Sequence, residues 1–200
     1  MDIKGSRVTI RPLTLDNVFK MRLWGYHDNP LLADYNFPCM TDKEIIKWHK
    51  YKTNSWRSKY YGIINEHDKF IGYIGIKDIK KFKKESTLGI VFDPNYTSMG
   101  YGTETLITFL KYYFTELDMK RMYLEVAEFN KRAHKLYENM GFIQEGYYLD
   151  VFFDQKINMN NQYYLNAESS FVISDKKIYN YIYRMRLEKE EFFLVTKTRS

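Results

Sequence analysis

Two glycines at alternate positions mark a segment whose backbone could hold an anion, and the segment reads Thr97, Ser98, Met99, Gly100, Tyr101, Gly102 and Thr103. It joins a strand-like run at 87–92 to a long helical pattern. The first N–H groups of a helix lack internal partners and form its positive end, and glycine lets a ligand approach the backbone. The pattern therefore predicts a phosphate or pyrophosphate site. A tight turn without a ligand is the alternative.

Two common nucleotide-binding motifs do not fit this segment. A P-loop would need a lysine directly after its second glycine, but Thr103 follows Gly102. A dinucleotide-binding fingerprint would need a third glycine or an alanine where Thr105 stands. The two glycines alone do not identify the ligand, and the rest of the sequence has to do so.

Further along the chain, Glu125 occupies a position from which it could accept a proton. It lies in an alternating run, on the strand face opposite Leu124 and Val126. A carboxylate on a strand can act as a general base and take a proton from a bound substrate. Partial burial would raise the pKa of Glu125 and let it act directly or through water. The alternative is an ion-paired strand glutamate. We expect the nearby His134 to point to solvent.

The elements that would position these residues can be followed in the sequence. Seven strands are predicted, at 8–10, 60–65, 70–76, 87–92, 122–127, 142–153 and 178–187. Helical patterns cover 14–27, a segment from 41 onward, 100–117 and the segment after Asn130, which is a good N-cap. Hairpins mixed with crossover helices predict an α/β (α+β) fold in a single domain at 1–190. Residues 154–175 should be irregular, and 191–200 should fray as a tail.

The composition limits the class of protein. Lys and Arg number 31 against 25 Asp and Glu, and a net charge of +6 favours anionic partners only weakly. Cys39 is the single cysteine and the four histidines lack metal-ligand spacing, so we expect no metal and no internal disulfide. The N-terminus lacks the apolar core of a signal peptide, and the apolar runs are too short to span a bilayer. We therefore expect a cytoplasmic protein.

A dense string of residues follows the glycine segment. It consists of Leu124-Glu125-Val126, Asn130, Ala133, Leu136-Tyr137-Glu138 and Gly141-Phe142. Together with Gly100-x-Gly102 and the opening Ile10-Arg11-Pro12-Leu13, this string resembles the GNAT superfamily of N-acetyltransferases. The chain looks most similar to the branch with the ribosomal-protein N-terminal acetyltransferases and the spermidine/spermine acetyltransferases. The resemblance covers residues 9–191 and is strongest over 88–146.

The resemblance implies an acetyl-CoA-dependent N-acyltransferase of the GNAT fold, with a mixed central sheet of about seven strands flanked by about four helices. The backbone amides of 97–103 would hold the CoA pyrophosphate, with Thr97 where the family usually has Gln or Arg. The pantetheine arm would lie beside Ile90, Val91 and Phe92, and Asn130 would bond to it. Tyr137 would protonate the CoA sulfur, and Glu125 would be the base. Alternatively, Tyr137 only packs in the apolar stripe of its helix.

The acceptor is left open between a protein N-terminus, a polyamine, an amino sugar and another small amine. Gly75 stands where the polyamine branch carries a carboxylate, which counts against polyamines, although Asp78 is retained. The segment 154–175 would be an insertion bordering the acceptor site, shared with a partner in a homodimer. One alternative is a non-catalytic acyl-CoA-binding or sensor module. A nucleic-acid-associated basic protein is a further alternative, made unlikely by the single basic cluster at 80–84.

Overall fold

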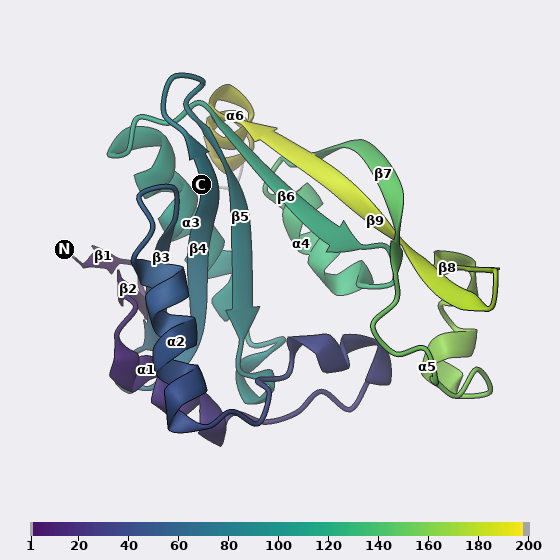
Figure 1. Ribbon diagram of the computed structural model, residues 1–200. Helices are drawn as coiled ribbons and strands as arrows, with labels where there is room; N and C mark the ends of the chain where they lie inside the picture. The colour runs from purple at the N-terminus through teal and green to yellow at the C-terminus, as the bar shows by residue number, and fades with distance from the viewer. Residues whose placement is uncertain (1, 198–200) are drawn as a thin grey trace.

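The computed structural model describes residues 2–197, which form one nine-stranded mixed sheet with helices on both faces (Figure 1). The strand order is β1-β2-β3-β4-β5-β6-β9-β7, and β8 pairs with β9. The predicted α/β class is confirmed, with nine strands rather than the seven expected. The strands are β1 (Ile3–Lys4), β2 (Val8–Pro12), β3 (Lys59–Asn65), β4 (Phe70–Lys80), β5 (Glu85–Phe92), β6 (Arg121–Ala127), β7 (Ile143–Val151), β8 (Phe171–Ser174) and β9 (Lys177–Glu188).

The helices are more numerous than the four expected, since the described residues form six α-helices and four short 3-10 helices. Side-chain caps define the starts of several of them, as the sequence predicted for Asn130, which accepts a 3.2 Å bond from the N–H of Ala133. The helices are α1 (Leu15–Lys20), η1 (Met21–Leu23), η2 (Pro30–Tyr35), α2 (Asp42–Thr53), η3 (Pro94–Tyr96), α3 (Tyr101–Thr115), α4 (Lys131–Asn139), α5 (Gln162–Leu165), η4 (Glu168–Ser170) and α6 (Lys189–Lys197).

The main hydrophobic core lies between the sheet and the helices α3, α4 and α6. Helix α3 buries a full stripe into it, at positions that recur every three or four residues: Leu106, Phe109, Leu110, Tyr113 and Phe114. A second cluster packs α1 and α2 against the opposite face of the sheet. Two buried layers hold the central strands rigidly, so residues that project from them have fixed positions.

The parallel pair β5 and β6 separates along its length and opens a wedge in the sheet. The two strands pair only at Glu85–Arg121, Ser86–Met122 and Thr87–Tyr123, near their N-terminal ends. Figure 1 shows β5 and β6 diverging below this point. Helix α3 follows β5 and α4 follows β6, so both helices begin at the wide end of the wedge. The chain thereby gathers its candidate site residues around one opening.

Three segments differ from the sequence prediction. The helix expected over 14–27 ends as α1 and η1 by Leu23, after which the chain is extended at Trp24. Residues 191–197 do not fray, because they belong to α6, whose Phe192 is 1% exposed in the main core. The remaining residues of the expected tail, 198–200, lie outside the described part of the chain.

The third difference is at 154–175, which contains α5, η4 and β8 instead of an irregular loop. Its few large apolar residues build a separate small core, which we name the distal cluster. The cluster consists of Leu31, Phe152, Ile157, Tyr164, Phe171 and Ile178. Because polar residues separate these side chains in the sequence, no helical or strand periodicity was visible there.

Candidate active site

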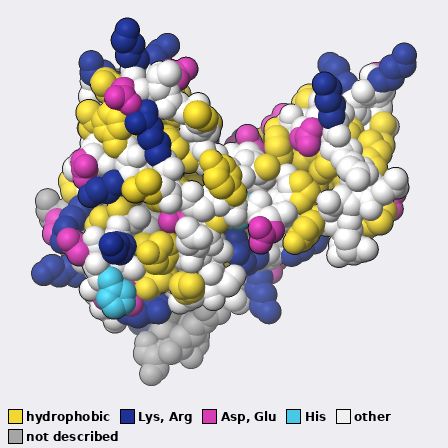
Figure 2. Space-filling model, turned by 90° about the horizontal axis from the view of Figure 1, so that it is seen from below, with side chains coloured by type: hydrophobic (Ala, Val, Ile, Leu, Met, Phe, Trp, Pro, Cys, Tyr) yellow, Lys and Arg dark blue, Asp and Glu magenta, His cyan; other side chains and the backbone are white. Residues whose placement is uncertain are grey.

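A cavity of about 600 Å³ lies in the wedge between β5 and β6. The exposed length of β5, the first turns of α3 and α4, and η2 form its walls. Figure 2 shows the surface of the molecule hollowed between the main body and the lobe that carries α5 and β8. A space of this size is typical of a small-molecule or cofactor site.

One end of the cavity is formed by the predicted anion-binding segment. Thr97, Ser98, Gly100, Gly102 and Thr103 line the cavity. Gly100 precedes α3 with φ +85, a left-handed conformation that favours glycine. The N–H groups of the first turn of α3 therefore face this end without internal partners.

The side chains of Met99 and Tyr101 lie outside the cavity, unlike the other residues predicted in this segment. Met99 is exposed, and its carbonyl oxygen accepts a bond from the Arg7 guanidinium at 3.2 Å. Tyr101 is buried and its hydroxyl donates to the Glu66 carboxylate at 3.1 Å. These two residues can contribute only their backbone to an anion site.

The side chain at position 97 is engaged within its own turn. Thr97 Oγ1 donates a 2.8 Å bond to the carbonyl oxygen of Pro94. A positive charge instead comes from α4, because Arg132 Nη1 donates to Ser98 Oγ at 3.2 Å and Lys135 also lines the cavity. Sequence reasoning missed Arg132, since nothing in the chain order brings it near Ser98.

Ile90, Val91 and Phe92 line the cavity along β5, as predicted. Ile90 and Phe92 pack toward the main core, and Val91 packs toward the second cluster. Beyond Thr87 this edge of β5 has no strand partner among the described residues. Its backbone N–H and C=O groups are therefore available to an extended ligand.

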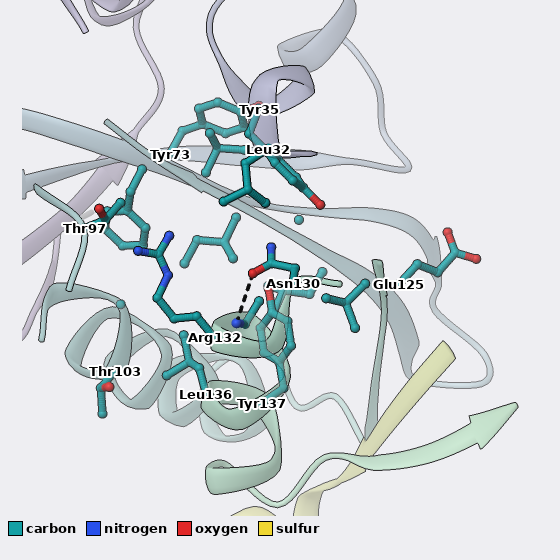
Figure 3. A pocket seen from close by; sticks show the side chains of 18 of the residues that line it. Leu32, Tyr35, Tyr73, Thr97, Thr103, Glu125, Asn130, Arg132, Leu136 and Tyr137 are labelled. Carbon is teal, nitrogen blue, oxygen red and sulfur yellow. Dashed lines mark hydrogen bonds between the residues drawn. The ribbon is translucent and has the colours of Figure 1, made fainter. Parts of the chain in front are cut away.

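The hydroxyl of Tyr137 lies deep in the wall of the cavity. Tyr137 is 9% exposed, and its ring packs edge-on against Phe142 at 5.7 Å. Figure 3 shows it rising from α4 toward Asn130. Burial, reinforced by the neighbouring Tyr35, raises the pKa of the Tyr137 hydroxyl far above its usual range. The group is protonated at neutral pH and can donate a proton.

Tyr35, which the sequence did not single out, reaches the same place from η2. Burial raises the pKa of the Tyr35 hydroxyl, and the side chain of Asn130 beside it acts in the opposite direction. Tyr35, Asn130 and Tyr137 thus bring three polar groups together from η2, the N-cap of α4 and the body of α4. Only Asn29-Pro30, an N-cap followed by proline, signals η2 in the sequence.

Glu125 lines the cavity at a distance from this group, as Figure 3 shows. Its side chain is 39% exposed, and Oε1 lies 3.7 Å from Nε of Arg184 on β9. Glu125 lies on the sheet face opposite the buried Leu124 and Val126, so its side chain is only partly covered.

His134 does not point to solvent as expected. It is half-buried, with its ring edge-on to Tyr183 at 5.1 Å. The strand β9 that carries Tyr183 covers this side of α4, which the sequence of α4 alone could not reveal.

Residues 2–197 contain neither a candidate metal site nor a helix that could span a membrane. No group of three or more His, Cys, Asp or Glu side chains in that part lies together in an arrangement that could hold a metal ion. In the same part, no helix combines the length and the apolar character needed to cross a membrane.

Comparison with known proteins identifies the family. The model of the acetyltransferase (GNAT) domain matches residues 7–143. The chain belongs to the GNAT acetyltransferase family. Among its curated relatives, a spermidine N(1)-acetyltransferase of Vibrio cholerae is 31% identical over 149 residues, which span 74% of this chain and 86% of that protein. A spermidine N(1)-acetyltransferase of Escherichia coli K12 is 28% identical over 46% of this chain and 47% of its own length.

Solved structures agree on the GNAT fold. The crystal structure of spermidine N-acetyltransferase from Vibrio cholerae in complex with CoA and spermine superposes with a TM-score of 0.70 at 19% identity. The match covers 94% of this chain and 99% of that one. The predictions of family, fold and enzyme class are therefore confirmed: the chain is an acetyl-CoA-dependent N-acetyltransferase.

Proposed function

We propose that this GNAT acetyltransferase binds acetyl-CoA along β5 and transfers the acetyl group to a primary amine that enters beside Glu125. The observation that carries the proposal is the wedge between β5 and β6, which has a helix N-terminus at one end and the buried Tyr137 hydroxyl in its wall. A site for an anion, an edge for an extended arm and a proton donor are thereby aligned in one cavity.

The residues of the wide end suit the phosphates of CoA. Unpaired N–H groups at the start of α3 favour an anion, and Ser98, Gly100 and Gly102 allow it to approach. Arg132 and Lys135 add positive charge from α4. The unpaired edge of β5 can bond to the amide groups of a pantetheine arm, as a neighbouring strand would.

The transfer step needs a base, an acid and a group that stabilises the carbonyl oxygen. The amine nitrogen forms the C–N bond while the C–S bond breaks. Glu125 takes the amine's proton, directly or through water, and Tyr137 gives its hydroxyl proton to the departing sulfur. A backbone N–H on the unpaired edge of β5 stabilises the oxygen as it gains charge.

The spermidine acetyltransferases among the relatives make a polyamine one acceptor to test. The cavity itself offers little to a polycation, because Glu125 is the single acidic residue among the described residues of its lining. The acceptor is therefore best identified from a panel of amines with different charges.

A homodimer through β7 is a separate proposal. This edge strand exposes a row of large apolar side chains: Ile143, Tyr147, Tyr148, Leu149 and Val151. An edge strand with exposed apolar residues is a surface that proteins usually cover. Light scattering after size exclusion should give a dimer mass for the wild type and a monomer mass for Leu149→Lys.

The first test of the proposed function is thermal unfolding with and without acetyl-CoA. A ligand present at 100 times its Kd adds roughly 2.7 kcal/mol of stability. A clear rise in Tm, followed by thiol release with at least one amine, supports the proposal. If millimolar acetyl-CoA leaves Tm unchanged, the wedge is not the donor site. Binding without release of thiol by any amine would favour a non-catalytic acyl-CoA sensor.

A further inference from the structure

We propose that Lys52 and Lys77 form a subsite for an anionic group of the acceptor, which is then a primary amine that also carries a carboxylate or a phosphate. The inference rests on the proposed function, since it concerns the acceptor side of the same cavity. It names the acceptor class that the residues of this chain favour.

The two lysines come from different elements and line the same end of the cavity. Lys77 lies on β4 directly opposite Thr87 of β5, where the wedge begins. Lys52 lies in the last turn of α2, and its Nζ is 3.4 Å from the hydroxyl of Tyr60. The Tyr60 ring lies 4.7 Å below this ammonium group and fixes its position.

The aromatic ring of Tyr60 also decides what the sheet can present here. Tyr60 pairs with Gly75 across β3 and β4. A Cβ atom added at Gly75 would lie 2.3 Å from the Tyr60 ring, so no side chain fits at position 75 while the ring is in place. Tyrosine and lysine therefore form the floor of this end, and the carboxylate of Asp78 is near enough to act on the Tyr60 hydroxyl.

Neither lysine has a carboxylate partner in the described part of the chain. No Asp or Glu oxygen there lies within 4.0 Å of either ammonium group, although Asp78 follows Lys77 directly. Burial, and then the charge of Lys77, lowers the pKa of Lys52. Two neighbouring cations with no carboxylate within 4.0 Å are stabilised when an anion binds between them. Glu125, the acid nearest in the lining, is engaged by Arg184.

The phosphates of CoA cannot be the anion that this pair serves. They are proposed to bind beyond Phe92, whereas Lys77 lies beside Thr87. Five residues of extended strand between Thr87 and Phe92 correspond to about 17 Å. The cavity is thus basic at both ends, and the second basic end belongs to the acceptor.

The charge of the acceptor decides how well it fits. A polyamine would bring further ammonium groups beside Lys52 and Lys77, and like charges at short range repel. An amine with a carboxylate or phosphate would place that group on the lysines and its nitrogen toward Glu125. The lysines also disfavour the ammonium form of the acceptor, which helps to supply the neutral amine that attacks.

The test compares matched pairs of acceptors by thiol release from acetyl-CoA. One pair is an amino acid and its carboxamide, the other is glucosamine 6-phosphate and glucosamine, and spermidine is the cationic acceptor. The wild type should prefer the anionic member of at least one pair by about tenfold or more in kcat/KM, since charge-assisted hydrogen bonds are worth that much. The pair that shows the preference distinguishes a carboxylate from a phosphate.

Reversing the charge of Lys77 tests whether the lysines set the preference for an anionic acceptor. Lys77→Glu should abolish the preference for the anionic member and raise kcat/KM for spermidine, and Lys52→Met should reduce the preference. Lys69→Glu is the matched control, because Lys69 is exposed and lies outside the cavity. A wild type that uses spermidine or the neutral amines best, or an unchanged preference in Lys77→Glu, overturns the inference.

A second readout separates this inference from the proposed transfer reaction. The rise in Tm that each amine adds to the CoA-bound protein reports binding without turnover. If no amine releases thiol, but anionic amines stabilise the wild type and not Lys77→Glu, the subsite stands and the transfer proposal fails. If no anionic amine raises Tm above its neutral partner and none is turned over faster, the subsite is wrong.

Discussion

The guanidinium group of Arg132 donates a 3.2 Å hydrogen bond to the hydroxyl of Ser98. This bond ties the first turn of α4 to the turn before α3, across the wide end of the wedge. Ser98 itself has φ +63, so the contact fixes a strained turn as well as a positive charge. Thr97 offers no positive charge to an anion, and Arg132 of α4 supplies that charge instead.

Replacing this guanidinium should weaken acetyl-CoA binding. In Arg132→Met we expect the Kd for acetyl-CoA to rise by about tenfold, the value of one charge-assisted hydrogen bond. Isothermal titration calorimetry measures it. Lys111→Met removes an exposed positive charge from α3 outside the cavity and should leave the Kd unchanged. An equal loss in both variants would mean that net charge alone matters.

Removing the Tyr137 hydroxyl should slow the chemical step and leave binding intact. We expect kcat of Tyr137→Phe to fall by about 100-fold, with KM for acetyl-CoA little changed, since a positioned acid contributes that much. Tyr163→Phe, at an exposed site outside the cavity, is the control. Because burial raises the pKa of Tyr137, its proton is retained as the pH rises from 7 to 9. A fall in kcat over this range that Tyr137→Phe abolishes would contradict the assigned role.

A side chain at Gly100 should strain the turn before α3. Gly100 has φ +85, and a Cβ atom there would lie 3.0 Å from Nη2 of Arg7. We expect Gly100→Ala to lower the free energy of unfolding by about 1 kcal/mol and to weaken acetyl-CoA binding. Urea unfolding provides the first value. Gly146→Ala is the matched control, because nothing lies within 4 Å of its Cβ position. Equal stability of the two variants would show that the left-handed turn is not required.

The distal cluster should stabilise η2 and thereby Tyr35. Leu31 is 2% exposed and joins η2 to Phe152, Phe171 and the rest of that cluster. Leu31→Ala should cost about 2–5 kcal/mol of stability through lost burial and a cavity. It should also raise the KM for the acceptor, because Tyr35 would lose its support. Leu165→Ala, at a 46% exposed site on α5, should change neither quantity. A destabilised Leu31→Ala with an unaltered KM would separate the cluster from the site.

Acid should destabilise the protein partly through His134. Burial, and then the charge of Lys131, lowers the pKa of His134 below its usual 6.5. The unfolded chain therefore binds a proton at a higher pH than the folded chain does. The contribution of His134 to the free energy of unfolding is complete above pH 6.5 and is lost as the pH falls from 6.5 toward the lowered pKa of the folded state. His27 acts in the same direction. His134→Gln should show a smaller fall in Tm between pH 7 and 5, and the exposed His67→Gln should match the wild type.

Helices and strands with regularly spaced apolar residues could be predicted, because the spacing is visible within each element's own stretch of sequence. Helix α3 and strand β6 each repeat apolar residues with the period of their own geometry, and Asn130 and Gly141 mark the ends of α4 through local backbone requirements. Segments with few apolar residues were misjudged. Residues 154–175 fold because a few of their large apolar side chains pack against Leu31, which lies far away along the chain. Helix α6 is ordered because Phe192 reaches the main core.

The sequence by itself determined the family, the glycine turn before α3 and the string that contains Glu125, Asn130 and Tyr137, because these features depend on residue types at fixed local spacing. Only the tertiary structure decided that Arg132 meets Ser98, that Tyr35 lies beside Tyr137, and that Lys52 and Lys77 share one end of the cavity. Those relationships join residues far apart along the chain. The separation of β5 from β6 and the packing of η2 bring them together, and no local pattern encodes either one.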